Sequence, residues 1–384
     1  MADYIALLLI RRRNLRRNRI FRDRSNPLDV YDDVELHKKF RFRRIDIMSI
    51  VDEIRGELEM SNRGNNVLAS TQVCVALNFY ATGSFLSECG DLVGISEATA
   101  CRIVRRVTKA LLSHAPRWIG LPDQREAEQQ KEKFLARGGF PNVLGCIDGT
   151  HIRIQAPRKN EHEFVNRNNF HSLNVQVICN ADLMFIGVLA KWPGSVHDAR
   201  ILRQSRVFTI FEGKGRPVDG VMLGDSGYMI RDWLLTPFQH PTTLPEIKYN
   251  AAHKCTHSTV DRTVEIAKKR WRCLRGLRVE PARACEVIVV CFMLSNRARS
   301  LNLGEPDDDS DDDDDDDAQN NNDDDDAQNN DDAQNNDDDD AQSNDEYDDN
   351  QYYDNVLEED VPKERALVAA GQAVRNQLVN NFFV

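Results

Sequence analysis

The feature that most constrains this chain is a long acidic, low-complexity run near its C-terminal end. From residue 305 to residue 360 the sequence contains 29 Asp or Glu residues and no Lys or Arg, set among repeats of Asp, Ala, Gln and Asn. Such a segment cannot bury enough apolar surface to offset the conformational entropy lost on folding. We therefore expect residues 304–360 to be a disordered acidic segment, followed by a C-terminal helix over residues 361–384.

The rest of the chain carries the opposite charge. All 384 residues together have a net charge of −12, but 29 of the 62 acidic residues lie in the acidic segment. The remainder has 33 acidic and 50 basic residues, and so a net charge of +17. A basic body beside a detached acidic run is typical of nucleic-acid-binding proteins, although a well-solvated basic surface beside a tail has the same pattern.

Cysteines and apolar runs exclude two other classes of protein. The nine cysteines are scattered and form no CxxC pair, which indicates free thiols in a reducing compartment and neither a zinc module nor a disulfide framework. The apolar runs are too short to span a bilayer, so no membrane partner is expected. The basic stretch at residues 11–24 is suited to a nuclear address or to DNA-backbone contact, and equally to a solvated helix face.

Composition predicts two folded regions before the acidic segment. Residues 1–130 place apolar and basic residues at helical spacing, which predicts a helical N-terminal region. Residues 140–303 begin with short β-rich runs broken by Gly, Asn and Pro and end with helical periodicity. This order predicts one α/β domain.

A helix-turn-helix is expected over about residues 77–112. Gly94 suits the tight turn, and Ser96 suits the N-cap of the second helix. The exposed side of that helix carries basic residues that would contact DNA phosphates, namely Arg102, Arg105 and Arg106. An ordinary amphipathic helix pair has the same pattern, so both interpretations stay open.

Two aspartates follow apolar runs that are typical of buried strands. Asp148 comes directly after residues 143–147, and Asp225 after residues 221–224. An ionised Asp beside a buried strand loses hydration free energy unless something compensates for it. A turn formed by Asp next to Gly or Ser would compensate at either position. Two such strand-end aspartates together favour a shared divalent cation.

A third carboxylate is expected from a helix over residues 258–274. Asp261 and Glu265 lie one turn apart on its polar face, which is either a surface of i,i+4 ion pairs or the source of another metal ligand. Two Mg²⁺ or Mn²⁺ ions about 3.5–4 Å apart activate water and stabilise the leaving oxygen in phosphodiester hydrolysis. These hard cations take carboxylate oxygens as ligands. Three acids that converge would therefore indicate a metal-dependent nuclease.

Ordered segments of the sequence resemble the motifs of PIF/Harbinger-type transposases and of the Harbinger-derived nucleases of animals, within the DDE superfamily. Residues 145–151 (GCIDGTH) resemble the first acidic motif of this family, and residues 223–228 (LGDSGY) resemble its second acidic motif. The remaining matches are residues 164–167, 171–174, 192–198, 257–263 and 270–274. Residues 81–105 are similar to the helix-turn-helix region of the family. The resemblance covers nearly all of the chain outside the acidic segment.

This resemblance implies an α/β fold with an RNase H-like mixed sheet flanked by helices, occupying residues 140–303. It implies Asp148, Asp225 and Asp261 as catalytic metal ligands. Asp198 matches a further acidic position and is a candidate additional ligand, although an acid in the first turn of a helix also favours the helix dipole. The third acid of the family is usually Glu, and this chain has Asp261 there. Glu265, one turn further along, is the fallback ligand.

The resemblance also implies a function. We expect an endonuclease that uses Mg²⁺ or Mn²⁺ to hydrolyse DNA by a two-metal mechanism. The alternative is a domesticated factor, weakly active or inactive, that binds DNA or other proteins. Family members often rely on a separate Myb/SANT-like DNA-binding protein, so such a partner is expected beside DNA, with a homo-oligomer as a further candidate. The expected location is the nucleus, with the cytoplasm as a second compartment.

Deleting residues 305–360 should tighten non-specific DNA binding, because a polyacidic segment competes with DNA phosphates for a basic body. The effect should be largest at low salt, where charges are screened least. Fluorescence anisotropy with a duplex of random sequence, between about 50 and 200 mM salt, measures it. An unchanged salt-dependent affinity would contradict a masking role for the segment.

Overall fold

The computed structural model describes most of the chain outside the acidic segment. The described residues are 25–59, 67–213, 215–305 and 361–383. The basic stretch at residues 11–24 and the acidic run from residue 306 to residue 360 lie outside them, so the expectations for both stay predictions. Among the described helices, none combines the length and the apolar character needed to cross a membrane.

The chain divides into two compact units, and the first is helical. The first unit comprises Met1–Phe79 and Ser84–Val107, and the second comprises Tyr80–Gly83 and Thr108–Val384. Helices of the first unit are α2 (Pro27–Val30), α3 (Asp33–Phe40), α4 (Arg44–Leu58) and α6 (Leu86–Asp91). Two longer helices begin in it, α5 (Ala69–Thr82) and α7 (Glu97–Ser113). The segment 77–112, predicted as two helices, therefore includes the end of α5, all of α6 and most of α7.

A tight turn joins α6 to α7 where one was predicted. Gly94 has a φ of 71°, a left-handed conformation that favours glycine. The Ile95 N–H donates to the Gly90 carbonyl at 2.9 Å, and a Cβ on Gly90 would lie 2.7 Å from the Ile95 carbonyl oxygen. Glycine at these two positions lets the chain reverse within a few residues. The turn thus sets the start of α7.

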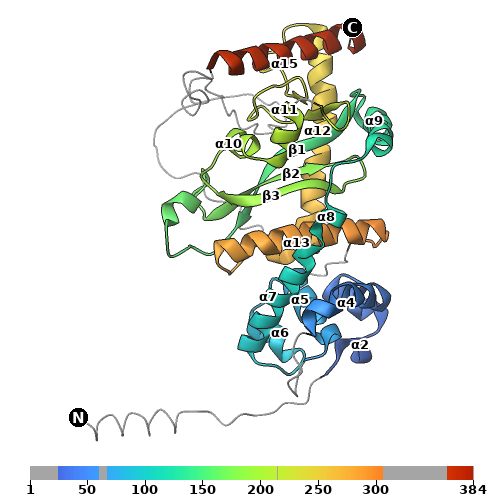
Figure 1. Ribbon diagram of the computed structural model, residues 1–384, viewed down its shortest axis with the longest axis vertical. Helices are drawn as coiled ribbons and strands as arrows, with labels where there is room; N and C mark the ends of the chain where they lie inside the picture. Colours follow the sequence, from blue (N-terminus) through green and yellow to red (C-terminus); the bar gives the residue numbers. More distant parts are fainter. Residues whose placement is uncertain (1–24, 60–66, 214, 306–360, 384) are drawn as a thin grey trace, which may run out of the picture. The chain divides into compact units, whose positions relative to one another are not determined.

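The second unit is built on a five-stranded mixed sheet, drawn in Figure 1. Its strands are β1 (Val143–Arg153), β2 (Ser172–Cys179), β3 (Phe185–Pro193), β4 (Val221–Leu223) and β5 (Leu234–Leu235). Their order across the sheet is β3-β2-β1-β4-β5. β2 pairs antiparallel with β1 and β3, while β1, β4 and β5 run parallel to one another. The expected mixed sheet flanked by helices is confirmed.

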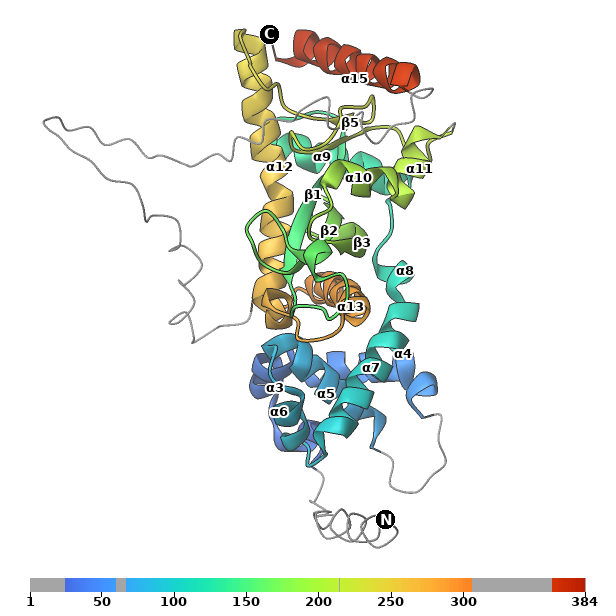
Figure 2. The same cartoon turned by 90° about the vertical axis from the view of Figure 1, so that its left-hand side faces the viewer.

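Helices cover both faces of this sheet. They are α8 (Ala115–Trp118), α9 (Gln124–Gly138), α10 (Asp198–Arg203), α11 (Arg206–Glu212), α12 (Leu244–Arg270), α13 (Pro281–Ser300) and α15 (Val361–Phe382). On one face, Leu202 of α10 and Phe211 of α11 join an apolar cluster with Ile147, Met222 and Trp233. Both views place α12 along the other side of β1 (Figures 1 and 2). Strand β1 is therefore packed between two layers of helices.

Helix α12 is longer than its sequence pattern predicted. Helical spacing indicated a helix over residues 258–274, but α12 begins at Leu244, where Thr243 and Glu246 form a capping box. It ends at Arg270, and residues Arg272–Arg275 form a short 3₁₀ helix. Its 27 residues reach from the β5 end of the sheet past β1. The extra turns carry two histidines that contact the strands.

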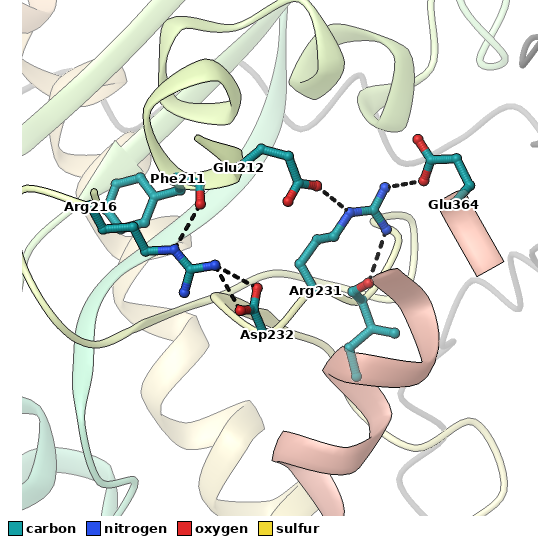
Figure 3. Close-up of polar contacts among 7 residues, drawn as sticks. Phe211, Glu212, Arg216, Arg231, Asp232 and Glu364 are labelled. Carbon is teal, nitrogen blue, oxygen red and sulfur yellow. Dashed lines mark hydrogen bonds and ion pairs between the residues drawn. The ribbon is translucent and has the colours of Figure 1, made fainter. Parts of the chain in front are cut away.

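The C-terminal helix α15 is tied to the second unit by a buried arginine (Figure 3). The side chain of Arg231 is 2% exposed and forms ion pairs with Glu212 and with Glu364 of α15. A Cβ on Gly371 would lie 2.8 Å from the backbone of Arg231, so glycine is required for this close approach. Further along α15, the guanidinium of Arg375 lies 3.9 Å from the centre of the Phe238 ring. Helix α15 is thus part of the folded unit.

Replacing Arg231 by Met should lower the free energy of unfolding by about 3–5 kcal/mol, because Glu212 and Glu364 would stay largely buried and charged after losing the guanidinium. Figure 3 also shows a matched control, the more exposed pair between Arg216 and Asp232, whose side chains are 31% and 36% exposed. Arg216→Met should cost less than about 1 kcal/mol. Urea unfolding measures both variants. Similar losses in the two would contradict a stabilising role for the buried cluster.

The buried histidine of α12 should make stability depend on pH. Burial, and then the nearby His257, lower the pKa of His253 to about 3, so the folded protein holds this ring neutral. Below the ordinary histidine pKa, His253 binds a proton in the unfolded chain but not in the folded protein. Stability should therefore fall from about pH 6.5 downwards, by up to about 1.4 kcal/mol per pH unit from this residue. The free energy of unfolding of His253→Gln, measured by urea unfolding, should therefore fall less steeply below about pH 6.5 than that of the wild type. The same pH dependence in the variant and the wild type would disprove this assignment.

Candidate active site

Asp148 lies within β1, and not at the end of a strand as its sequence context predicted. Strand β1 pairs with β4 only from Val143 to Cys146, whereas its pairing with β2 continues to Arg153. Asp148 therefore lies just beyond the point where β4 ends, in a strand that continues because β2 still satisfies its backbone. The alternative of a turn at Asp148 is wrong.

Asp225 lies at the matching position of the neighbouring strand. Leu223, the last residue of β4, pairs with Cys146, so Asp148 and Asp225 each lie two residues beyond a paired position in adjacent parallel strands. The backbone N–H of Gly149 donates to Asp148 Oδ1 at 2.7 Å. The N–H of Gly227 donates to Asp225 Oδ1 at 3.2 Å. The backbone thus orients both carboxylates.

Asp198 approaches the same strand from α10. It is the first residue of α10, as expected, and its Oδ1 accepts a hydrogen bond from Asn174 Nδ2 at 2.9 Å. A Cβ at Gly149 would overlap the Asp198 carboxylate. Glycine beside Asp148 therefore leaves room for a further carboxylate, which is a steric role different from the turn that the sequence suggested.

Helix α12 brings Asp261 to β1 from the other side. His257 Nε2–H donates to the Ile147 carbonyl at 3.1 Å, and Asp261 lies one turn after His257 on an exposed part of α12. Glu265 lies one turn further, is 61% exposed, and forms an ion pair with Lys269 at 3.0 Å. Lys268 donates to the His151 carbonyl at 3.2 Å, so α12 contacts β1 both before and after Asp261.

Electrostatics link the aspartates. Burial raises the pKa of Asp148 well above its ordinary value, and the negative charges of Asp225 and Asp261 raise it further, with a smaller contribution from Asp198. Burial also raises the pKa of Asp198. Side chains far apart in the sequence thus lie close enough to repel one another. A cation among them would relieve that repulsion.

Tyr228 is a site residue that the sequence analysis did not single out. Its side chain is 3% exposed, and its hydroxyl has no hydrogen-bond partner among the described residues. Burial, and then the charges of Asp198, Asp148 and Asp225, raise its pKa. An unpartnered buried hydroxyl beside carboxylates is suited to a water molecule or another ligand in the site. Its place in the second acidic motif, three residues after Asp225, was the available signal.

The donor set fits a hard divalent cation. Within the part of the chain that the structure describes, no three His, Cys, Asp or Glu side chains already stand in a geometry that would hold an ion. The side chains gathered at β1 offer carboxylate oxygens, which Mg²⁺ and Mn²⁺ take as ligands, and no thiolate. The Asp198 carboxylate beside Gly149 and the unpartnered hydroxyl of Tyr228 offer further polar atoms for such an ion and its water.

The predicted DNA-contacting arginines lie on α7, in the first unit. Arg102, Arg105 and Arg106 are exposed there, while Val104 and Val107 between and beside them are buried. Arg102 donates to Thr99 Oγ1 at 3.1 Å, and Arg106 donates to Gln72 Oε1 at 3.2 Å. DNA contact at α7 stays a prediction.

Comparisons with known proteins identify the relatives of this chain. Residues 147–296 match the DDE superfamily endonuclease family. The chain is 37% identical over 275 residues to "Putative nuclease HARBI1" of Mus musculus, covering 70% of this chain and 78% of the relative. The Homo sapiens protein of that name is 36% identical over the same length and the same shares. "Protein ALP1-like" of Arabidopsis thaliana is 31% identical over 254 residues, covering 61% of this chain and 62% of the relative. No solved structure matches the chain.

The family match begins at Ile147 and ends at Asn296, so it includes Asp148, Asp198, Asp225 and Asp261. The long alignments with animal nucleases agree with the resemblance to Harbinger-derived proteins. This chain therefore belongs to the DDE superfamily endonucleases, among the transposase-derived nucleases related to HARBI1.

Proposed function

We propose that this protein is a metal-dependent endonuclease that hydrolyses DNA phosphodiester bonds. Its metal ligands are Asp148, Asp225 and Asp261, and its fold is of the RNase H-like type. The observation that carries the proposal is the convergence of carboxylates from β1, from the end of β4 and from α12 in a chain of an endonuclease family. Bound Mg²⁺ or Mn²⁺, as a pair of ions, would supply Lewis acids that activate a water molecule and stabilise the leaving oxygen.

The chain's own residues would hold and orient this centre. The N–H groups of Gly149 and Gly227 hold one oxygen of Asp148 and one of Asp225 in place, so that both carboxylates are oriented as candidate ligands for an ion. Asn174 restrains Asp198, a candidate additional ligand, in the same way. Such backbone and amide contacts keep ligands in place before the substrate binds.

Beyond the acids, we propose that α7 supplies DNA-backbone contacts through Arg102, Arg105 and Arg106, as in a helix-turn-helix. The exposed guanidinium groups on one side of α7 support this role. A nuclear location, a Myb/SANT-like partner and a homo-oligomer belong to the same proposal and rest on the family alone.

One observation favours a second candidate, a DNA-binding factor that does not cleave. Asp261 is shorter than the Glu usual in the family and is exposed, and the described carboxylates do not yet form a closed three-ligand group. In that case the protein would bind DNA with the same basic surfaces and show no metal-dependent nicking.

A plasmid-nicking assay with Mg²⁺ and with Mn²⁺ decides between the two candidates. Asp148→Asn and Asp225→Asn should each lower the nicking rate by about 100-fold or more, because the Lewis-acid contribution is worth several kcal/mol. Asp232→Asn, which removes an exposed acid paired with Arg216, is the matched control and should nick at the wild-type rate. Equal nicking by all proteins would point to contamination or to another site.

The third ligand is identified by the same assay. Asp261→Asn should lose nicking as Asp148→Asn does, while Glu265→Gln should keep most of it, since Glu265 is paired with Lys269 at the surface. The reverse ranking would assign the third position to Glu265. Full activity in both variants would leave only the two strand carboxylates in the centre and would contradict a role for α12.

A further inference from the structure

Two histidines of α12 form hydrogen bonds to the sheet, one to β1 and one to β5. The His257 Nε2–H donates to the Ile147 carbonyl at 3.1 Å. The His253 Nε2–H donates to the Leu235 carbonyl at 3.2 Å, and the Gly224 N–H donates to the same carbonyl at 3.1 Å. The two rings stack with centres 5.6 Å apart and planes 15° apart. They therefore act as one stiff unit between the helix and the sheet.

These hydrogen bonds lead to the residues directly before the two strand aspartates, through the Ile147 carbonyl itself and through the Leu235 carbonyl that Gly224 shares with His253. Ile147 precedes Asp148, and Gly224 precedes Asp225. A hydrogen bond to a carbonyl restrains the peptide plane that leads into the next residue. The histidine pair therefore restrains the backbone on which both carboxylates stand.

The same face of α12 carries the third acid. His253, His257 and Asp261 are spaced four residues apart, so they lie one above the other along the helix. A shift of α12 along the sheet would break the two histidine contacts and move Asp261 away from β1 together. The position of Asp261 and the restraint on the strand aspartates are thus set by one set of contacts.

Core packing alone does not explain these side chains. His253 packs against Phe140 and Tyr249, with ring centres 6.0 and 6.1 Å away. An aromatic hydrocarbon ring would fill that space without burying a polar nitrogen. What an imidazole adds is an N–H donor aimed at a strand carbonyl at each of two successive turns.

We propose that His253 and His257 are positioning residues, which fix α12 against β1 and β5 so that Asp261 reaches the metal site formed by Asp148 and Asp225. This inference rests on the proposed function. Neither ring touches a carboxylate in the described contacts, so both act through the backbone. They hold the ligands at a fixed separation before any ion binds.

Mn²⁺ binding followed by electron paramagnetic resonance on the full-length protein tests the proposal without using activity. His257→Leu removes the donor and should weaken Mn²⁺ affinity by about 10-fold or more, as loss of a residue that supports metal ligands does. His257→Gln keeps an N–H donor and should stay within about 3-fold of wild type, well inside the 10-fold loss typical of such residues. His240→Leu, at an exposed position before α12, is the matched control and should bind as wild type. Equal affinity in the Leu variant, or equal loss in Leu and Gln, would overturn the proposal.

Amide hydrogen exchange on the metal-free protein separates this proposal from the proposed function. His257→Leu should speed exchange in β1 around Asp148 and in α12 around Asp261, and should leave α13 unchanged as an internal reference. Unchanged exchange in β1 and α12 would show that the ring does not hold them together. If the wild type binds no Mn²⁺ but His257→Leu still speeds exchange, the proposed metal centre is wrong, while the proposal that the histidines hold α12 against the strands is supported.

Discussion

A carboxylate buried beside other carboxylates is the constraint on which the active unit depends. Asp148 loses hydration in β1 and lies within the field of Asp225, Asp261 and Asp198, and both effects favour its protonated form. A fold can hold such a group only if its backbone is fixed from several directions, since repulsion would otherwise push the side chains apart. Strand β1 meets this need: β2 pairs with it from Cys146 to Arg153, β4 pairs with its start, and helices pack on both faces.

The sequence predicted the parts of this arrangement that have a local signature. The apolar runs before Asp148 and Asp225 indicated two strands, and the helix expected over residues 258–274 indicated the α12 region. The mixed sheet with flanking helices followed from that order and from the family resemblance. The sequence did not show that β1 continues past Asp148, because strand length there depends on pairing with β2, between residues that are 29 positions apart at Asp148 and 19 apart at Arg153.

Contacts between side chains and distant backbone were beyond prediction for the same reason. His253 and His257 sit in a helix with no periodic signal that separates them from surface histidines, and their partners are carbonyls, which every residue has. Gly149 looked like a turn residue, but its function is to leave space for Asp198. Likewise, nothing near Arg231 in the sequence indicates Glu364 as its partner, since the acidic segment separates them. Each of these required the tertiary structure.

Asp261, the third acid that we propose, is shorter than Glu, and α12 approaches its neighbours closely just before it. A Cβ on Gly138 would overlap the Thr256 side chain, so α9 and α12 meet with no room for a larger residue. On the other flank, the Cys146 Sγ–H donates to the Thr256 carbonyl at 3.4 Å, which requires a small side chain on β1 at that level. Small residues on both sides therefore let α12 lie close to β1 just before Asp261. This close approach favours the shorter side chain of Asp261 over Glu265, which is paired with Lys269 at the surface, in the third position that we propose.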